Sequence, residues 1–421
     1  MTTPFVIHIV ISLDPGGLER LVVDWTNARN CRHPGSTMIA CLDHLGMLAD
    51  QVKDDAVVCI GARRDRFPWD QPAVKRLREV IRGKGEGESE QKTEVGSQQT
   101  KDGNQRPEYS GQRIADNLPV LHFTHHSSLI TSPAVVFHAH NLAAWQYAVL
   151  SSRGTGARVL YTQHGVNRHN HGLVGRLRTR WLARHTAAIV TVSATTAEAM
   201  GVFQAVPRER ISVIPNGIAI EPAGTESSRE ALRRELGVPP HAFIVGSVGR
   251  FAPEKNYPLL VAAFADFQRL HRDAVLVFVG DGPERAAIEE AIVRAGIEAA
   301  CRLPGMQSDV GPWVRAMDLF CLTSSTEGIS VALLEAGAHG VPCVATAVGG
   351  NVEVIENEMT GLLVKPGDRE AITNALARLY DDSDLRTHMG IAARERVAKM
   401  YPLAVTLDAY ERLYVKQAPH E

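Results

Sequence analysis

The stretch HAFIVGSVGRFAPEKNYPLLVAAFADFQRLHRDAVLVFVGDG (241–282) decides the fold class. Its two apolar runs, 241–250 and 273–282, are short, rich in β-branched residues, and each leads into a glycine turn. Between them, 257–270 carries apolar residues at helical spacing. Continuous apolar strands separated by a helix are typical of parallel sheets that are covered by helices on both faces. The stretch therefore predicts a strand–helix–strand unit of such a sheet.

The same alternation extends over most of the 421 residues. Other strand-like runs are found at 6–12, 157–165, 187–193, 210–217, 318–324 and 341–350. Near 214–230 the strand pattern gives way to Pro, Gly and Ser, which indicates a domain junction. We therefore predict an α/β protein with one doubly wound parallel-sheet domain at 1–218, a second at 219–395, and a C-terminal helix at 396–421. That helix could pack on either domain.

The composition excludes several classes of protein. Lys plus Arg number 45 and Asp plus Glu number 47, so the chain lacks the strongly basic character of a nucleic-acid-binding protein. The polar, Gly-, Glu- and Ser-rich segment within 83–118 predicts a disordered surface insertion. The six cysteines have no C-x-x-C spacing, which favours reduced thiols in a cytoplasmic protein. The first apolar run is too short for a signal peptide or a spanning helix.

Two glutamates flank the start of an apolar helix predicted within SSTEGISVALLEAGAHG (324–340). The turn after Glu327 would expose free N–H groups at the helix N-terminus, which is a ready anion site. If all eight residues from Glu327 to Glu335 were helical, they would span roughly 12 Å, comparable to the distance from a sugar across a diphosphate to a ribose. The alternative is that Glu327 only caps the helix and Glu335 is solvated.

Further candidates follow other predicted strands. Arg250 and Lys255 come after the strand at 241–250, where two cations suit a diphosphate, although they could be ordinary surface cations. Gly16 and Gly17 precede a predicted helix, so their backbone could approach a phosphate, although a tight turn also explains them. VGDGPER (279–285) lacks the third glycine of a dinucleotide fingerprint, so no hydride-transfer cofactor is expected.

Histidines form the last group of candidates. His138 and His140 in FHAHN have strand spacing and should point to one face. No acidic residue stands at 142 and no cysteine is near, so no metal is expected there. Each histidine is either a buried structural residue or a contact of a reacting sugar, and the same question applies to His164.

These motifs together resemble the family-4 retaining glycosyltransferases, which have the GT-B fold of two Rossmann-like domains that face each other across a cleft. The resemblance is carried by Gly16-Gly17, HAHN (138–141), TVS (191–193), IPNG (214–217), GRFAPEK (249–255), VGDGPE (279–284), Glu327 with Glu335, VATAVGGNVEVI (344–355) and TGLLVKPGD (360–368). It implies an enzyme that moves a sugar from a UDP- or GDP-linked donor to a hydroxyl of a glycan or lipid-linked acceptor. It also implies a role in bacterial cell-surface polysaccharide biosynthesis, retention of anomeric configuration, and no need for a metal or another cofactor.

The resemblance also assigns residues to roles. It implies a catalytic set that contacts the donor sugar and its diphosphate: His140, Arg250, Lys255 and Glu327. It implies a donor-binding set of glycine turns, helix-start amides and a ribose-binding carboxylate: Gly16, Gly17, Gly249, Ser330, Val331 and Glu335. Whether His138 or His140 faces the sugar stays open. Asn256 departs from the family pattern, because a glycine is common after the lysine.

Two other functions remain as alternatives: a nucleotide-sugar epimerase of the same architecture, and a non-catalytic sugar-nucleotide-binding protein.

The segment 117–197 is strongly basic, because it holds seven arginines and neither lysine nor an acidic residue. Four of these arginines lie within 172–185, among apolar residues. Such a basic amphipathic stretch could dock a peripheral enzyme on the anionic cytoplasmic face of a membrane. A core-packed helix with a solvated basic face is the alternative.

Overall fold

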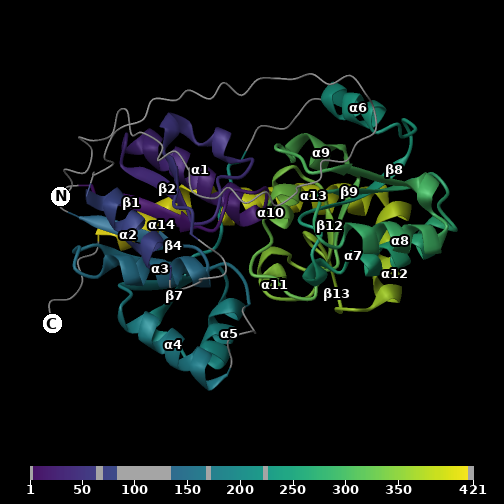
Figure 1. Cartoon of the computed structure of the whole chain (residues 1–421). Coiled ribbons are helices and arrows are strands. Elements are labelled where there is room, and N and C mark those ends of the chain that lie inside the picture. The colour runs from purple at the N-terminus through teal and green to yellow at the C-terminus, as the bar shows by residue number, and fades with distance from the viewer. Residues whose placement is uncertain (1–2, 63–69, 83–133, 167–171, 221–225, 416–421) are drawn as a thin grey trace.

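The computed structural model describes residues 3–62, 70–82, 134–166, 172–220 and 226–415. The insertion predicted at 83–118 lies outside these residues. The described chain forms two all-parallel sheets with helices packed around each, which confirms the predicted α/β class (Figure 1).

The first sheet has the strand order β3-β2-β1-β4-β5-β6-β7. Its strands are β1 Phe5–Val10, β2 Thr37–Cys41, β3 Val57–Cys59, β4 Val135–Ala139, β5 Arg158–Gln163, β6 Ala188–Thr191 and β7 Ile211–Val213. The helices of this part are α1 Gly17–Arg32, α2 Gln71–Arg82, α3 Leu142–Ser152, α4 Leu173–Arg184 and α5 Ala194–Gln204. Every residue of β1 and of β4 is buried, as expected of central strands covered on both faces. Asn141 and Ser193 cap α3 and α5 with their side chains.

The second sheet has the order β10-β9-β8-β11-β12-β13. Its strands are β8 Phe243–Val248, β9 Ala274–Val279, β10 Cys301–Gly305, β11 Leu319–Leu322, β12 Cys343–Thr346 and β13 Gly361–Val364. The helices that follow the first sheet are α6 Glu226–Glu235, α7 Tyr257–Gln268, α8 Arg285–Ala295, α9 Gly311–Ala316, α10 Val331–Ala338, α11 Asn351–Val354, α12 Arg369–Asp381, α13 Ser383–Met400 and α14 Leu403–Val415. The sequence 241–282 forms β8, α7 and β9 as predicted.

Strand order reverses between β1 and β4 in the first sheet and between β8 and β11 in the second. In open parallel sheets, ligands bind outside the carboxyl ends of the strands at such a switch point. Gly16-Gly17 follows β1 and His140 follows β4, whereas Arg250 follows β8 and Glu327 follows β11. The topology therefore brings the candidate residues to the switch point of each sheet.

The last helix packs on the first domain, which settles a point that the sequence left open. After α13 ends at Met400, α14 returns to the first sheet, where it is the yellow helix beside the purple and blue strands of Figure 1. Glu411 of α14 forms an ion pair with the buried Arg29 of α1 at 2.6 Å. Tyr414 bonds to the buried His138 at 2.8 Å. The two connections between the domains run side by side, because Ile218 pairs with Pro402.

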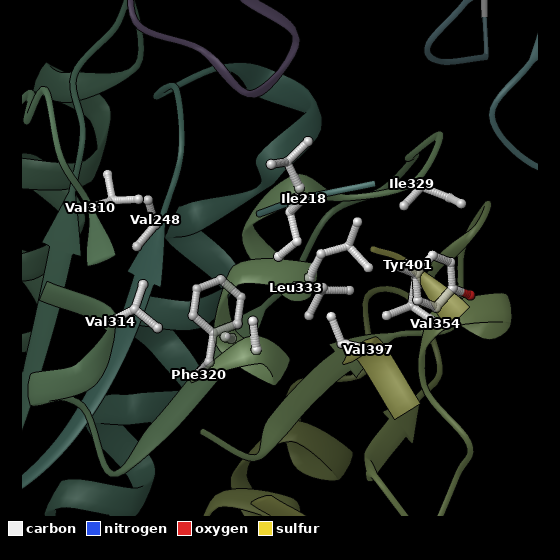
Figure 2. Close-up of a cluster of buried hydrophobic side chains, with 14 of the residues drawn as sticks. Ile218, Val248, Val310, Val314, Phe320, Ile329, Leu333, Val354, Val397 and Tyr401 are labelled. Atoms are coloured by element: carbon white, nitrogen blue, oxygen red, sulfur yellow. The ribbon is translucent and has the colours of Figure 1, made fainter. Parts of the chain in front are cut away.

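One apolar cluster continues from the first domain into the second. Val192 of the first domain, Ile218 of the connection, and Ile329 and Leu333 of the second domain all belong to it. Figure 2 shows Ile218, Ile329, Leu333 and Tyr401 close together, with side chains from several elements turned toward one another. A carboxylate of the second domain also caps a helix of the first, because the Ala194 amide at the start of α5 donates to Glu353. The domains thus share packing and polar contacts.

Candidate functional site

The loop after β8 is held in place by the glycine turn after β9. Gly249 has φ +153° and Gly280 has φ +144°, and a Cβ on Gly280 would overlap the carbonyl oxygen of Gly249. A Cβ on Gly282 would lie 2.5 Å from the carbonyl oxygen of Phe251. Phe251 also donates its amide to the Asp281 carbonyl at 2.8 Å. VGDGPE therefore needs its glycines to support the Gly249 loop, which explains this motif without a ligand.

That loop presents the two predicted cations in different ways. Arg250 is exposed, whereas Lys255 is half-buried and its Nζ lies 2.6 Å from Oε1 of Glu327. The hydroxyl of Ser324 donates to the same carboxylate oxygen at 2.7 Å. Asn256 has φ 50° in the left-handed region, where glycine is favoured and asparagine is tolerated. The departure at Asn256 therefore keeps the backbone conformation of the lysine loop.

The helix α10 begins four residues after Glu327, so most of the path from Glu327 to Val331 is a turn rather than helix. The condition for the 12 Å span, a continuous helix from Glu327 to Glu335, is therefore not met. Ser330 is 4 % exposed at the helix start and makes no side-chain cap. Its hydroxyl is buried and has no hydrogen-bond partner in the described part of the chain. Glu335 lies one turn after Val331 on the same helix face.

Two helix N-termini from different domains meet at this point. A Cβ on Gly17 at the start of α1 would lie 3.2 Å from the side chain of Val331 at the start of α10. A Cβ on Gly328 would overlap the carbonyl oxygen of His164. Gly328 is thus needed for the close approach of the domains, whereas a side chain at position 17 would only crowd Val331. Because each helix N-terminus carries partial positive charge, their convergence favours an anionic ligand.

Glu19 also lies at this meeting point, although the sequence analysis did not predict it as a site residue. Its carboxylate folds back onto the start of α1, where a Cβ on Gly16 would overlap Oε2 of Glu19. Burial raises the pKa of Glu19 to about 7, with a further rise from Asp14, while its own backbone amide and Arg250 act in the opposite direction. An acidic residue three positions after a glycine N-cap was the available signal. The interaction with Arg250 of the other domain could not be read from the sequence.

The predicted histidines belong to a buried cluster in the first domain. The rings of His138 and His140 lie 4.1 Å apart, so they do share one face. His8 on β1 is paired in register with His138 on β4, and a nitrogen of each of these three histidines lies within 4.8 Å of the others. Both nitrogens of His138 are already hydrogen-bonded, to Tyr414 and to Thr162, at 2.8 Å each. The cluster is therefore a hydrogen-bonded network, and a metal would have to displace those bonds.

His140 and His164 differ in their position relative to the second domain. His140 is 1 % exposed and lies behind His164, with Nδ1 of His140 and Nε2 of His164 separated by 3.1 Å. His164 is half-buried and its backbone touches Gly328. The structure thus brings Gly17, Val331, Glu327 and Lys255 to the meeting edge of the domains, together with His164. The role of His140 at a sugar stays a prediction.

Comparisons with known proteins identify the family. The model for glycosyl transferases group 1 matches residues 228–396, and the model for glycosyltransferase family 4 matches residues 105–222. The UDP-Gal:alpha-D-GlcNAc-diphosphoundecaprenol alpha-1,3-galactosyltransferase of Escherichia coli is 31 % identical over 49 % of this chain and 54 % of that protein. The N-acetyl-alpha-D-glucosaminyl L-malate synthase of Bacillus anthracis is 34 % identical over 44 % of this chain and 48 % of that protein. The chain thus spans about half the length of these two curated relatives.

A solved structure matches almost the whole fold. The Anabaena protein HepE, crystallised with UDP and glucose, superposes with a TM-score of 0.75 at 18 % identity, covering 97 % of this chain and 98 % of that chain. At this identity the likeness concerns the fold alone. The two family models match separate parts of this chain, residues 105–222 and 228–396, which together make up more than half of it, and the arrangement of the two sheets agrees with the matched structure. The chain therefore belongs to the family-4 glycosyltransferases, with their two-domain GT-B fold.

Proposed function

We propose that the protein is a retaining glycosyltransferase that moves a sugar from a nucleotide-diphosphate sugar to a hydroxyl of a glycan or lipid-linked acceptor in cell-surface polysaccharide biosynthesis. The main support is the start of α10, where the Ser330 hydroxyl is buried without a partner among the described residues and where Glu327, three residues earlier, pairs with Lys255. The first amides of a helix also lack intrahelical partners. Such a site suits a diphosphate with a hydroxyl-rich sugar beside it.

The proposed reaction follows from this arrangement. The bond between the sugar C1 and the diphosphate oxygen breaks, and the charge that develops on the leaving diphosphate is stabilised by Arg250, Lys255 and the α10 amides. The acceptor oxygen bonds to C1 on the same face, and its proton passes to the departing phosphate oxygen. Glu327 holds donor sugar hydroxyls and Glu335 holds the ribose. The two cations supply the positive charge, so the proposal includes no metal.

A UDP-linked donor is the first choice among UDP and GDP. The name of the Escherichia coli relative specifies UDP-galactose, and HepE was crystallised with UDP and glucose. These facts concern those proteins, and they support UDP as the first nucleotide to examine here. The Escherichia coli relative is named as a galactosyltransferase, and neither curated relative named above is called an epimerase, so they give no support to the epimerase alternative.

A two-step experiment tests the proposal. A thermal-shift screen against UDP-, GDP- and ADP-sugars should show one nucleotide class that raises the unfolding temperature, because a ligand of the folded state stabilises it. Release of that nucleotide is then measured with and without a bacterial glycolipid extract. Release that depends on the extract supports a transferase. Consumption of the donor without any acceptor, or binding without turnover, would favour the epimerase or the binding protein instead.

We further propose that α4 docks the enzyme on an anionic membrane at its cytoplasmic face. Leu173, Val174 and Leu177 are 75 %, 81 % and 58 % exposed on this helix. Three of its arginines are also exposed: Arg176, Arg180 and Arg184. The opposite helix face packs inward through Thr179, Leu182 and Ala183. Exposed apolar side chains beside exposed arginines suit a surface of anionic lipid better than they suit water.

Arg178 differs from these three because it is half-buried and lies 3.2 Å from the Gln146 side chain. In the described part of the chain, no helix is long and apolar enough to cross a bilayer.

Vesicle binding tests the docking proposal. Changing Arg176, Arg180 and Arg184 to Gln should weaken binding to phosphatidylglycerol-containing vesicles by about two orders of magnitude, since each basic residue near such a surface contributes about 1 kcal/mol. The matched control changes the exposed Arg234, Arg272 and Arg294 of the second domain to Gln and should bind like the unmodified protein. Equal binding by both triple variants would rule out docking through α4.

A further inference from the structure

The buried His8 and His140 and the half-buried His164 form a hydrogen-bonded row that leads toward the second domain. Nδ1 of His8 lies 2.8 Å from Nε2 of His140, and Nδ1 of His140 lies 3.1 Å from Nε2 of His164. Burial lowers the pKa of His8 and of His164 to about 3, and it lowers the pKa of His140 well below its usual value. All three rings are therefore neutral at physiological pH.

Because the three rings are neutral, the hydrogen bonds along the row must all be donated in the same direction. A neutral imidazole has one N–H donor and one acceptor nitrogen. If His8 donates from Nδ1, then His140 accepts at Nε2 and must donate from Nδ1 to His164. If His164 donates instead, every bond is reversed. The three rings must therefore all be Nδ1–H tautomers or all be Nε2–H tautomers, and the residue beyond His164 decides which.

That residue is Asn216, in the connection that follows β7. It is 2 % exposed, and its Nδ2 donates to the carbonyl oxygen of Ile329 at 3.3 Å. The remaining atom, Oδ1 of Asn216, is buried, and so is Nδ1 of His164. Among the described residues neither atom has a hydrogen-bond partner, so one is a donor or acceptor that the other could satisfy. The Asn216 side chain raises the pKa of His164, whereas burial lowers it. A group that raises a histidine pKa in this way accepts a hydrogen bond from the ring.

The orientation of the Asn216 amide favours one of the two directions. Nδ2 donates to Ile329, so the buried Oδ1 is left as an acceptor, and it complements His164 only if that ring carries its proton on Nδ1. With a bond between these two atoms, the row would run from His8 through His140, His164 and Asn216 to the Ile329 carbonyl. Ile329 lies in the turn between Glu327 and α10, beside the buried hydroxyl of Ser330. The row thus begins in the core of the first domain and ends at the turn that precedes α10 in the second.

We propose that His8, His140, His164 and Asn216 form a directed hydrogen-bond row, with each ring in the Nδ1–H form, that holds the turn before α10 against the first domain. His164 and Asn216 are then positioning residues of the site at the start of α10. The row itself does not depend on the proposed function, whereas its effect on donor binding rests on it. Asn216 would couple the connection between the domains to the amides at the start of α10.

Nitrogen-15 NMR of histidine-labelled full-length protein tests the row directly, because the two tautomers have different Nδ1 and Nε2 shifts. We expect three rings in the Nδ1–H form between pH 5 and 8. In Asn216→Ala the acceptor is lost, and the signals of all three should move together toward the Nε2–H form. Three Nε2–H rings in the unmodified protein, or no response to Asn216→Ala, would overturn the proposal.

The control is Asn30→Ala, which removes another buried asparagine of the first domain. Asn30 donates to the Thr37 carbonyl and accepts from the Thr37 amide at 3.0 Å each, away from the histidine row. Its removal should leave the histidine tautomers unchanged even if it lowers stability. A coordinated change of tautomers in this variant would mean that general loosening, rather than Asn216, controls them.

Calorimetry with UDP tests the coupling to the site. Asn216→Ala should weaken UDP binding by about tenfold, and Asn30→Ala should leave it within about twofold. Unchanged UDP affinity in Asn216→Ala would refute the positioning role. If the unmodified protein does not bind UDP, the proposed donor is wrong, and the NMR result still decides whether the row exists.

Discussion

Replacing Lys255 with alanine is expected to lower kcat by about 10²- to 10³-fold, equivalent to about 3–4 kcal/mol of transition-state stabilisation. The reason is that Lys255 sits at the carboxyl end of β8 and is oriented by Glu327 at 2.6 Å. A preorganised cation of this kind interacts most strongly with charge that develops during the reaction. The measurement is single-turnover release of the nucleotide selected by the thermal-shift screen.

The control for this change is Lys365→Ala. Lys365 is exposed in the second domain after β13, so its loss removes a positive charge without altering the loop after β8. It should keep kcat within about twofold. A kcat near that of the unmodified enzyme in Lys255→Ala would refute the assignment of Lys255 to the leaving group.

Replacing Gly328 with alanine should lower kcat/KM by about a hundredfold. The added Cβ would overlap the His164 carbonyl oxygen and come within 3.0 Å of the Val192 side chain. A backbone atom cannot move away by changing rotamer, so the turn before α10 must shift away from the first domain. A displacement of about 1 Å in a positioned site costs about 10²-fold in rate. Steady-state kinetics measures the loss, and small-angle scattering should detect the altered domain contact.

Gly165→Ala is the matched control, since Gly165 adjoins His164 and a Cβ there meets no atom of the described residues within 4 Å. It should behave like the unmodified enzyme in both measurements. If Gly328→Ala kept full activity and the same scattering curve, the contact between the turn and His164 would have no functional role.

The strand pattern predicted the two sheets because their central strands are covered on both faces and so are apolar throughout. Fully buried strands such as β8 and β9 need no knowledge of their neighbours to be recognised. The contact of the turn before α10 with the first domain was harder to predict. A glycine at position 328 indicates only an unusual backbone conformation or a close neighbour. Its reason for being glycine is the His164 carbonyl, which belongs to a distant part of the sequence.

The histidine row shows the same limit more clearly. His8 stands alone in an apolar strand, and nothing nearby in the sequence distinguishes it from an ordinary buried histidine. It meets His140 only because β1 pairs with β4, although β2 and β3 lie between them in the chain. Asn216 and Glu19 likewise acquire their partners through the packing of one domain on the other. Local pattern therefore found the glycine turns and cations, whereas tertiary contacts define their partners.

The return of α14 to the first domain has a consequence for the order in which the chain is made. Tyr410 and Tyr414 of α14 belong to the same apolar cluster as Trp25 and Leu160 of the first domain. On the ribosome these tyrosines emerge only after the whole second domain. Until then the N-terminal half must remain with an uncovered apolar face and without the Tyr414 hydroxyl that bonds to His138. The first domain to be synthesised is thus completed only after the second, when α14 has been made.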